Sequence, residues 1–457
     1  MGKRVVVVGG DAAGMSAAAQ AKRLKPDLDV VVFERGRHTS YSACGIPYWV
    51  AGDVDDVTQL VARTPEEHRR RGLDVRMGTE VVALDPERGE VVARDVGTGS
   101  ESRVAYDELV LATGARPLRP PVPGIDAPGV HGVQTLDDGE AILDALRSRE
   151  PRRAVVVGGG YIGVEMAEAM VRRGLEVTVV DMAAEPMSTL DPDMGALVHK
   201  AMEGLGIDVR TSTAVREVAL DAEGRARAVV TDAGELPADI VVLGTGVRPE
   251  TRLAQEAGLP LGRFGGVTVD LRMRVCGREN IWAAGDCVES LGLVSGARIH
   301  VALGTHANKQ GRVIGTNLGG GYATFPGVVG TAVSKVCDLQ IARTGLREFE
   351  CDEVGFSWLT VVVDSTTAAG YHPEAQPITV KLIAERRTGR LLGAQIVGKE
   401  GAAKRIDACA VALWNRMTVE EMTALDLGYA PPFSPAWDPV LIAARKAADL
   451  VAEDTCR

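Results

Sequence analysis

The stretch RAVVVGGGYIGVEMAEAMVRRGLEVTVVD, residues 153–181, decides the fold class of this chain. A short run of β-branched residues leads into a glycine-rich turn, then a helical segment, then a second apolar run that ends on an acid. This order is typical of a dinucleotide-binding βαβ unit, in which the pyrophosphate faces the N-terminus of the helix. The turn glycines are Gly158, Gly160 and Gly163, and the terminal acid is Asp181.

Each position of this fingerprint has a physical task. The first glycine permits the tight turn, the second lets the backbone approach the pyrophosphate, and the third allows close packing of the helix. Asp181 is placed to bind the ribose hydroxyls of the nucleotide. Residues 181–187 contain no lysine or arginine but include a second acid, Glu185. A 2′-phosphate would be repelled there, so we expect NADH to bind in preference to NADPH.

Residues 4–34 repeat the same plan in a degenerate form. Gly9 and Gly14 flank the turn and Glu34 is the terminal acid, but Asp11 stands where the second glycine is expected. Two further phrases support a second nucleotide site: LATGARP at residues 111–117 and AAGD at residues 283–286. We therefore expect the first unit to bind FAD. The expected FAD contacts are Gly9, Gly14, Glu34, Thr113, Gly114, Gly285 and Asp286.

The order of these phrases predicts the domain organisation. LATGARP has a near copy, LGTGVRP, at residues 243–249, and the two flank the second unit. We interpret the second unit as a nucleotide domain inserted into the first, which gives an α/β protein with two Rossmann-like domains. A C-terminal α+β domain follows. We expect the FAD-binding domain at residues 1–115 and 245–323, the NAD(P)-binding domain at residues 116–244 and the C-terminal domain at residues 324–457.

The expected strands fall into two groups. In the nucleotide domains they are near-continuous apolar runs, as in parallel sheets that are buried on both faces. These runs are residues 5–8, 30–33, 109–112, 154–157, 177–180, 240–243 and 281–284. Antiparallel strands are expected later, at residues 358–363, 378–383 and 391–397, before a helix-rich region from residue 399 to about residue 451.

Composition excludes several classes of protein. The formal net charge of the 457 residues is −11 and no lysine/arginine block stands out, so a nucleic-acid partner is not expected. No apolar run approaches the roughly 20 residues that span a bilayer, and no secretory signal is recognisable, so we expect a cytoplasmic protein without a membrane anchor. Seven cysteines without CxxC spacing resemble neither a disulfide framework nor a metal site. Cys456 is expected in a disordered tail.

The segment SYSACGIPYWV, residues 40–50, carries the candidate reactive group. Pro47 fits the first turn of a helix, which places Cys44 at a helix N-terminus, where we expect the pKa of the thiol to be lowered. Thr39 and Trp49 occupy the usual spacings of a second redox cysteine. Any disulfide of Cys44 is therefore expected to join it to a small molecule, or else its oxidised form is a sulfenate or persulfide.

These motifs together resemble the pyridine nucleotide-disulfide oxidoreductases, and in particular the single-cysteine branch that contains coenzyme A-disulfide reductase. The resemblance covers essentially the whole chain. It rests on SYSACGIPY, LATGARP, GGGYIG, AAGD, KEGAAKRID at residues 399–407 and GYAPPFSPAWDPV at residues 428–440. It implies a homodimer whose C-terminal dimerisation domain reaches across to complete the active site.

The resemblance also implies roles for individual residues. Cys44 would face one side of the flavin and the nicotinamide the other, with Tyr161 covering the nicotinamide pocket and Glu165 lining it. Tyr371 and Tyr429 would lie near flavin and thiol, where either could protonate a departing CoA thiolate. The implied contacts with a CoA substrate are Ser16, Gln20, Arg23, Ser40 and His306, and Arg71 is a further candidate from the basic run 69–71, which is otherwise a solvated charge run.

Two absences narrow the implied activity. Ala12 stands where peroxidases and water-forming oxidases of this family carry a histidine, and the second cysteine of the mercuric, glutathione and lipoamide reductases is missing. What remains is NADH-dependent reduction of CoA disulfide or CoA persulfide through FAD and Cys44. Three alternatives stay open: an NADH oxidase that reduces dioxygen, a redox sensor that binds FAD and NADH without turnover, and an electron carrier similar to rubredoxin or ferredoxin reductases.

Overall fold

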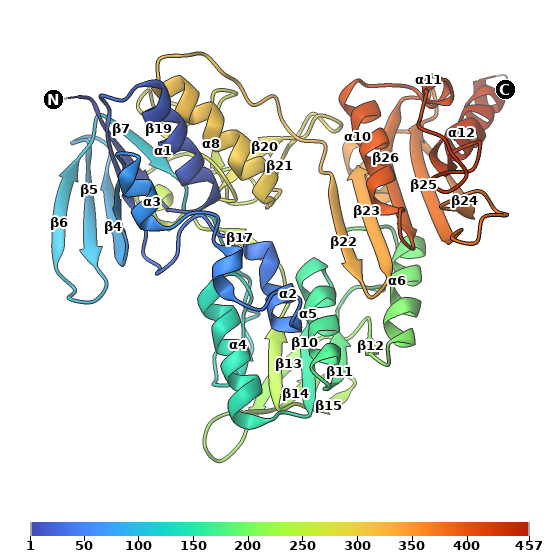
Figure 1. Ribbon diagram of the computed structural model, residues 1–457, viewed down its shortest axis with the longest axis horizontal. Coiled ribbons are helices and arrows are strands. Elements are labelled where there is room, and N and C mark those ends of the chain that lie inside the picture. The colour runs from blue at the N-terminus through green and yellow to red at the C-terminus, as the bar shows by residue number, and fades with distance from the viewer. Residues whose placement is uncertain (1, 456–457) are drawn as a thin grey trace.

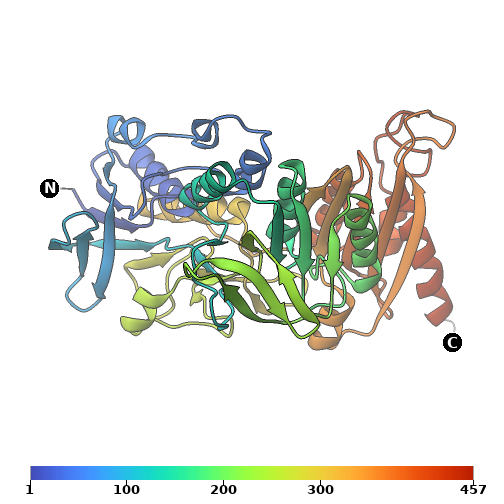
Figure 2. The same ribbon diagram turned by 90° about the horizontal axis from the view of Figure 1, so that it is seen from below.

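The computed structural model describes residues 2–455, which form three bodies (Figure 1). The N-terminal body is blue with yellow segments, the second body is green, and the C-terminal body is orange and red. Figure 2 shows the green body between the other two. Cys456 lies outside the described residues. No helix within residues 2–455 is long and apolar enough to cross a membrane.

The first parallel sheet has the strand order β19-β7-β1-β2-β3. Its strands are β1 (Arg4–Val8), β2 (Asp29–Phe33), β3 (Asp74–Arg76), β7 (Glu108–Leu111) and β19 (Ile281–Ala283). Helix α1 (Ala12–Leu24) connects β1 to β2. Apart from their first and outermost positions these strands are mostly buried, as their β-branched sequences predict for a sheet covered on both faces.

The second parallel sheet repeats this arrangement with the order β12-β11-β10-β16-β9. Its strands are β9 (Val130–His131), β10 (Arg153–Val157), β11 (Glu176–Val180), β12 (Asp208–Arg210) and β16 (Ile240–Leu243). Helix α5 (Tyr161–Arg172) takes the place of α1. The order β16-β10-β11-β12 matches β7-β1-β2-β3, so the predicted repeat of two βαβ units is confirmed, as are the strands predicted for it.

The repeat extends further than the sequence indicated. Between its third and fourth parallel strands, each unit carries a three-stranded antiparallel meander, and neither meander was predicted. The first consists of β4 (Thr79–Asp85), β5 (Glu90–Asp95) and β6 (Glu101–Ala105). The second consists of β13 (Val215–Leu220), β14 (Ala226–Thr231) and β15 (Gly234–Pro237).

The second body is joined to the first by two segments that run side by side. Strand β8 (Ala115–Pro117) pairs antiparallel with β17 (Val247–Pro249), and the Glu250 backbone N–H donates to the Gly114 carbonyl at 2.9 Å. The two phrases that the sequence presented as near copies are therefore hydrogen-bonded neighbours.

The C-terminal body is built on an antiparallel sheet with the order β22-β23-β26-β25-β24. Its strands are β22 (Ala332–Val336), β23 (Leu339–Gly345), β24 (Trp358–Thr366), β25 (Pro377–Glu385) and β26 (Leu391–Gly398). The three predicted strands correspond to β24, β25 and β26, and β22 and β23 were missed. The predicted helical region contains α10 (Ile406–Trp414), α11 (Val419–Thr423) and α12 (Pro439–Thr455), with a non-helical segment before α12. The expected fold class is confirmed.

The remaining elements connect these sheets or cover them. They are α2 (Ile46–Ala51), α3 (Pro65–Arg70), α4 (Leu136–Arg149), α6 (Pro192–Gly204), α7 (Arg252–Glu256), α8 (Gly304–Leu318), α9 (Glu348–Val354), β18 (Val267–Thr268), β20 (Val288–Leu291) and β21 (Arg298–Ile299), with 3₁₀ turns at Ala43–Gly45, Val57–Leu60 and Ala403–Arg405. Helix α8 lies against α1, and α2 lies against α5 and α4 of the second body (Figure 1).

Candidate active site

Cys44 lies in the 3₁₀ turn Ala43–Gly45, directly before helix α2. Pro47 occupies the first turn of α2, as predicted. The side chain of Cys44 is exposed, whereas Ile46 and Val50 on the same short helix are fully buried. These two residues pack in the core of the second body, together with residues of α4 and α5. The thiol is therefore presented to solvent by a helix anchored beneath it.

The electrostatic surroundings of Cys44 differ from our expectation. Partial enclosure by protein raises the pKa of the thiol, and the carboxylates of Glu165 and Asp286 raise it further. The expected lowering of this pKa by a helix N-terminus is wrong for this structure. The physical reason is that enclosure by protein, and secondarily the two carboxylates, disfavour the thiolate, while α2 has only six residues and so a small dipole.

Residues from both nucleotide units converge on this thiol. Glu165 comes from α5 of the second unit, and Asp286 follows β19 of the first. Burial raises the pKa of Glu165 to about 7, although its Oε1 accepts a hydrogen bond from Ser334 Oγ at 2.8 Å. Burial likewise raises the pKa of Asp286. Cys44 thus lies at the junction between the two units.

Tyr48 is a neighbour of this site that sequence reasoning missed. Partial burial raises the pKa of its phenol, and the charges of Glu165, Glu168 and Cys44 act in the same direction. Tyr48 lies on α2, four residues after Cys44 in the preceding 3₁₀ turn. That spacing was the available signal.

The glycine turn of the second unit has the shape that a pyrophosphate requires. Gly158 has φ +100°, and a Cβ on Gly163 would lie 1.8 Å from the Gly158 carbonyl oxygen, so neither position accepts a side chain. Gly160 caps α5 without any side-chain hydrogen bond, which leaves the first-turn N–H groups free for phosphate oxygens. Asp181 accepts hydrogen bonds from the backbone N–H groups of Gly159 and Ala183.

The turn of the first unit is built in the same way. Gly9 has φ +105°, and a Cβ on Gly14 would lie 1.9 Å from the Gly9 carbonyl oxygen. Glu34 accepts from the N–H groups of Gly10 and Gly36, each at 2.7 Å, as Asp181 does in the second unit. Helix α1 also begins without a side-chain cap. Both turns therefore fit dinucleotide pyrophosphates, despite the degenerate sequence of the first.

Asp11 occupies the position that departs from the fingerprint. Its Oδ1 accepts a hydrogen bond from the Tyr41 backbone N–H at 3.2 Å. Burial raises its pKa to about 6, and the nearby charges of Glu34 and Asp286 contribute in the same direction.

The other expected FAD residues lie at the same edge of the first sheet. Thr113 and Gly114 follow the end of β7, and Gly285 and Asp286 follow the end of β19, so all four lie beyond the carboxyl ends of parallel strands. Thr113 Oγ1 donates to the Glu250 carbonyl at 2.5 Å, and the Gly285 N–H donates to Gln310 at 2.8 Å. This edge is where open α/β sheets bind ligands.

Tyr161 begins α5 and lies largely inside the protein. Its hydroxyl is buried near Thr189, and burial raises the pKa of the phenol. Tyr161 and Glu165 are four residues apart and therefore lie on the same face of α5.

The expected substrate residues lie on α1, on α8 and in the segments next to α3. Ser16, Gln20 and Arg23 lie along α1, where Ser16 Oγ donates to Asn308 of α8 at 2.7 Å and Gln20 accepts from Arg23 at 2.7 Å. In this arrangement Ser16 and Gln20 contact the protein itself, and Arg23 is exposed.

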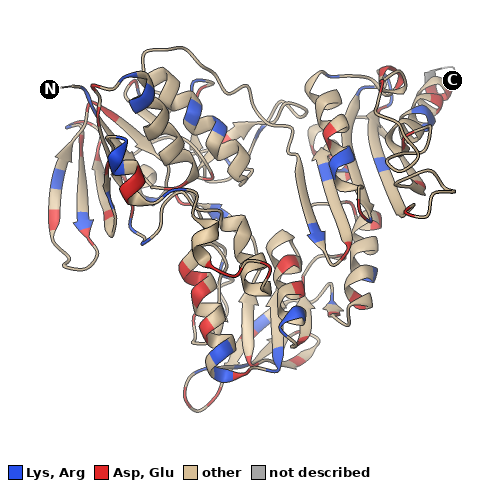
Figure 3. Ribbon diagram, viewed as in Figure 1, with Lys and Arg blue, Asp and Glu red and all other residues tan. Residues whose placement is uncertain are grey.

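Ser40 lies next to helix α3. Its hydroxyl is 2.9 Å from Nε2 of the buried His68, and Arg71 follows α3 on the surface. Figure 3 shows basic residues on both α1 and α3. His306 lies at the start of α8, and burial lowers its pKa to about 4 while its Nδ1 has no partner within the described part of the chain. His306 is therefore a neutral residue in this structure.

The structure does not bring Tyr371 and Tyr429 to Cys44 of the same chain. Tyr371 lies between β24 and β25, and Tyr429 lies between α11 and α12, both in the C-terminal body and away from α2 (Figure 1). Their side chains are 80% and 56% exposed. Phe433 and Trp437, in the same non-helical segment as Tyr429, are 74% and 48% exposed. The C-terminal body thus presents a group of aromatic side chains to solvent.

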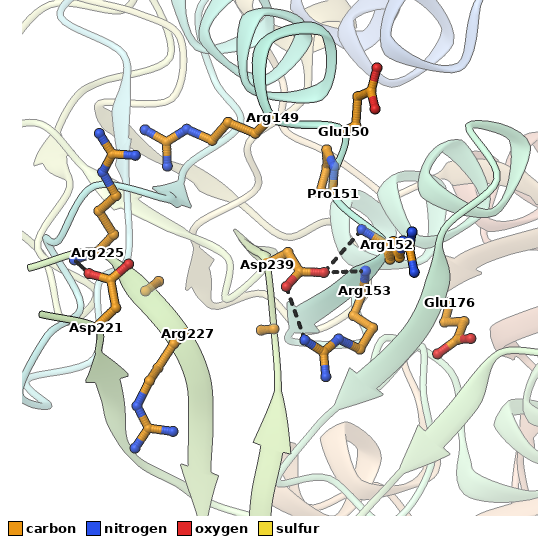
Figure 4. Close-up of a pocket in the computed structure, with 12 residues that line it drawn as sticks. Arg149, Glu150, Pro151, Arg152, Arg153, Glu176, Asp221, Arg225, Arg227 and Asp239 are labelled. Carbon is orange, nitrogen blue, oxygen red and sulfur yellow. Dashed lines mark hydrogen bonds and ion pairs between the residues drawn. The ribbon is translucent and has the colours of Figure 1, made fainter. Parts of the chain in front are cut away.

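An open depression of about 720 Å³ lies elsewhere, at the opposite edge of the second sheet (Figure 4). There Asp239 accepts hydrogen bonds from the Arg152 and Arg153 backbone N–H groups at 3.0 Å and from the Arg153 side chain at 3.1 Å. Arg153 and Glu176 begin β10 and β11, so this depression lies at the amino ends of the strands. It is not the dinucleotide site, because the glycine turn lies at the carboxyl ends.

Comparison with known proteins identifies the family. Residues 3–310 match the family described as pyridine nucleotide-disulphide oxidoreductase. The chain belongs to this family. Residues 331–440 match the dimerisation domain of the same family. Pyridine nucleotide-disulphide oxidoreductases use FAD and NAD(P)H, and the two glycine turns described above have the form needed to hold them.

Three similar proteins indicate the range of activities among relatives. A Pyrococcus abyssi protein named NAD(P)H sulfur oxidoreductase (CoA-dependent) is 38% identical, over 97% of this chain and 98% of that protein. A Methanocaldococcus jannaschii protein named NADH oxidase is 36% identical over 97% and 98%. The solved structure of an NAD-dependent persulfide reductase from A. fulgidus is 40% identical with a TM-score of 0.94, and covers 98% of this chain and 83% of that one.

Proposed function

We propose that this pyridine nucleotide-disulphide oxidoreductase transfers electrons from NADH to CoA disulfide or CoA persulfide through Cys44. One observation carries the proposal. A single exposed thiol, without a second cysteine at redox-disulfide spacing, lies where Glu165 of one nucleotide unit and Asp286 of the other converge. The names of the Pyrococcus and A. fulgidus relatives, with 38% and 40% identity, support the same substrate class.

We assign the two nucleotides to the two units. Residues 1–115 and 245–323 form the FAD-binding domain, with Gly9, Gly14, Glu34, Thr113, Gly114, Gly285 and Asp286 as contacts. Residues 116–244 form the NAD(P)-binding domain, with Gly158, Gly160, Tyr161, Gly163, Glu165 and Asp181 as contacts. The pairing of β8 with β17 supports these boundaries. In this division the chain passes into the second unit at β8 and returns to the first just before β17.

NADH is the proposed donor in preference to NADPH. The Asp181 carboxylate is fixed by two backbone N–H groups at the end of β11, where a 2′-phosphate would meet it. Glu185 adds a second acid nearby, although its Oε2 is paired with His199 Nδ1 at 2.7 Å. Steady-state kcat/KM values should favour NADH, and a higher value for NADPH would contradict this assignment.

The protein residues then act as follows. The Cys44 thiolate attacks one sulfur of the CoA disulfide, so that a mixed disulfide forms and one CoA thiolate leaves and takes up a proton. FAD, when bound, supplies a two-electron relay between the nicotinamide and a disulfide. Two electrons cleave the mixed disulfide, which releases the second CoA thiol and restores the Cys44 thiolate. Ser16, Gln20, Arg23, Ser40, Arg71 and His306 are the proposed contacts with the CoA moiety.

The proton donors are proposed to come from a second copy of the chain. Tyr371 and Tyr429 are exposed and lie away from Cys44 of their own chain, whereas residues 331–440 match a dimerisation domain. A homodimer would cover the exposed aromatic group and bring one of these phenols to the partner's thiol, where it protonates the leaving CoA thiolate. The C-terminal dimerisation domain comprises residues 324–457 in this assignment.

Intact-protein mass spectrometry of the untreated holoenzyme under non-reducing conditions tests the proposal. We expect a CoA mass adduct that dithiothreitol removes and that Cys44→Ser abolishes, together with the CoA-disulfide reductase activity. Cys276→Ser is the matched control, because Cys276 is the other exposed free cysteine among the described residues. Full turnover in Cys44→Ser, or an adduct that persists there, would show that another group carries the electrons.

A second candidate function is NADH oxidase activity, since the M. jannaschii relative of 36% identity carries that name. In that case Cys44 cycles through a sulfenate and dioxygen is the acceptor. Oxygen consumption and CoA-disulfide turnover measured on one preparation separate the two functions. We expect CoA-disulfide turnover to be the faster.

A further inference from the structure

Helix α5 carries the glycine turn at its N-terminus and two arginines at its C-terminus. Its N-terminus forms the glycine turn of the second nucleotide unit, and its C-terminus ends on Arg172 and Arg173. Helix α2 packs against α5. The helix that receives the dinucleotide is therefore the one against which the thiol-bearing segment packs.

The C-terminal end of α2 is held by the two arginines. Arg173 Nε donates to the Val50 carbonyl at 2.5 Å, which satisfies one of the backbone acceptors that a short helix leaves open at its end. Arg172 binds both carboxylate oxygens of Asp53, each at 2.5 Å, in a bidentate pair just beyond α2. Gly52, with φ +93°, makes the turn between the two contacts.

Apolar packing fixes the rest of α2 to the same body. Ile46 and Val50 are fully buried in a core that contains Met166 and Met170 of α5. The fit is tight on the other side as well, since a Cβ on Gly139 of α4 would lie 2.9 Å from the Trp49 ring. The segment that presents Cys44 therefore takes its support from the second nucleotide unit.

We propose that Arg172 and Arg173 are positioning residues for Cys44, which clamp α2 to the dinucleotide-binding helix α5 and so set the place of the thiol. The inference rests on the proposed function, because it assigns these arginines a role only through the reactivity of Cys44. Neither arginine contacts substrate or cofactor in this assignment. Their effect passes through the α2 backbone, over the two helical turns between Val50 and the thiol.

The proposal predicts different effects on the two half-reactions, which are reduction of the flavin by NADH and reduction of CoA disulfide by the reduced enzyme. In holoenzyme of Arg173→Ala and of Arg172→Ala, we expect reduction of the flavin by NADH to stay within about twofold of wild type. Reduction of CoA disulfide by the pre-reduced enzyme should fall about tenfold or more, because small displacements of a reacting group are costly. Arg173→Lys keeps a cationic donor and should recover part of the loss.

A second readout does not depend on turnover. A loosened α2 withdraws Cys44 from Glu165 and Asp286, so more of the thiol is ionised, and alkylation of Cys44 by iodoacetamide at pH 7 should accelerate about threefold or more. Arg147→Ala on the neighbouring helix α4 is the matched control, since Arg147 donates hydrogen bonds to Leu143 and Asp144 of its own helix. Thermal melting and flavin content establish that each variant is folded.

The possible outcomes distinguish a failure of the arginine clamp from a failure of the proposed function. Wild-type values for both the disulfide half-reaction and alkylation in Arg173→Ala would overturn the clamp. The clamp would also be overturned if the rates of both half-reactions fell equally and flavin was lost. That result would mean that the arginines have a purely structural role. Retained CoA-disulfide turnover in Cys44→Ser would overturn the proposed function instead, and the alkylation rates would then still decide whether the arginines position the thiol.

Discussion

At the scale of single residues, the charges that act on the thiol within the described part of the chain are those of carboxylates. Glu165 and Asp286 both raise the pKa of Cys44, and Glu165 itself titrates near neutrality with a pKa of about 7. The sequence named Glu165 and Asp286 as site residues but did not predict their effect on the pKa of Cys44, because they are more than a hundred positions away along the chain. The ionisation of the Cys44 thiol and that of the Glu165 carboxyl therefore depend on each other.

Glu165→Gln tests this interaction. Glu165 is ionised above about pH 7, and its negative charge then disfavours the Cys44 thiolate, so removing the charge lowers the pKa of the thiol. We expect the midpoint of the pH profile for Cys44 alkylation to move to lower pH in the variant. Glutamine keeps an amide oxygen that can accept the Ser334 hydrogen bond.

Glu176→Gln, at the opposite edge of the second sheet, serves as the control and should leave the midpoint unchanged. An unaltered or higher midpoint in Glu165→Gln would mean that Glu165 does not govern the thiol.

At the scale of elements, the contact between α1 and α8 depends on a row of glycines. Gly311 and Gly315 are four residues apart on α8, and Cβ atoms there would lie 2.2 Å and 2.5 Å from the carbonyl oxygens of Ala13 and Ala17. The two helix backbones thus approach more closely than any side chain permits. Because α1 begins at the glycine turn of the first unit, this packing also fixes that turn.

Gly311→Ala should destabilise the protein by about 1–3 kcal/mol, because the added methyl group meets backbone that cannot move aside. The loss is measured as a lower denaturation midpoint, with a parallel fall in flavin retention. Gly304→Ala, at the start of the same helix, has open space around the new Cβ and should change stability by no more than about 0.5 kcal/mol. Equal effects of the two substitutions would refute the packing argument.

Elements with a strong periodic pattern were predictable, and contacts between distant elements were not. The seven apolar runs named in advance all form strands of the two parallel sheets, and the repeated fingerprint correctly indicated two βαβ units, whereas the strand orders came from the structure. The two meanders escaped notice because their strands alternate polar and apolar residues in short, charged segments. The docking of α2 onto α5 was also missed, since nothing in the residues around Ile46 says which core receives them.

At the scale of the whole molecule, the second and C-terminal bodies are joined by a buried polar contact. Lys381 of β25 is only 2% exposed, and its Nζ lies 3.2 Å from Asp191, 2.8 Å from Asp193 and 2.8 Å from Glu348. Gln395 also donates to Asp191, at 2.6 Å. Because a buried charge is tolerated only with such partners, these two bodies are held in one relative orientation.

Complementation between two inactive variants tests whether the chains share an active site. Mixing Cys44→Ser with Tyr429→Phe and allowing subunits to exchange should restore about one quarter of wild-type activity, since half of the dimers then hold one intact site. Cys44→Ser alone, treated identically, is the control. Failure to recover activity with both Tyr429→Phe and Tyr371→Phe would place the proton donor in the same chain as the thiol.

The pairing of β8 with β17 also has an engineering consequence. Entry to the insertion and exit from it are neighbours, so excising residues 118–246 would leave two ends that a very short linker can rejoin. The shortened chain would retain the glycine turn at Gly9 and its supporting helices. It would lose the apolar surface beneath Ile46 and Val50. The placement of the thiol therefore depends on the inserted segment and not on the unit that carries Cys44 in its sequence.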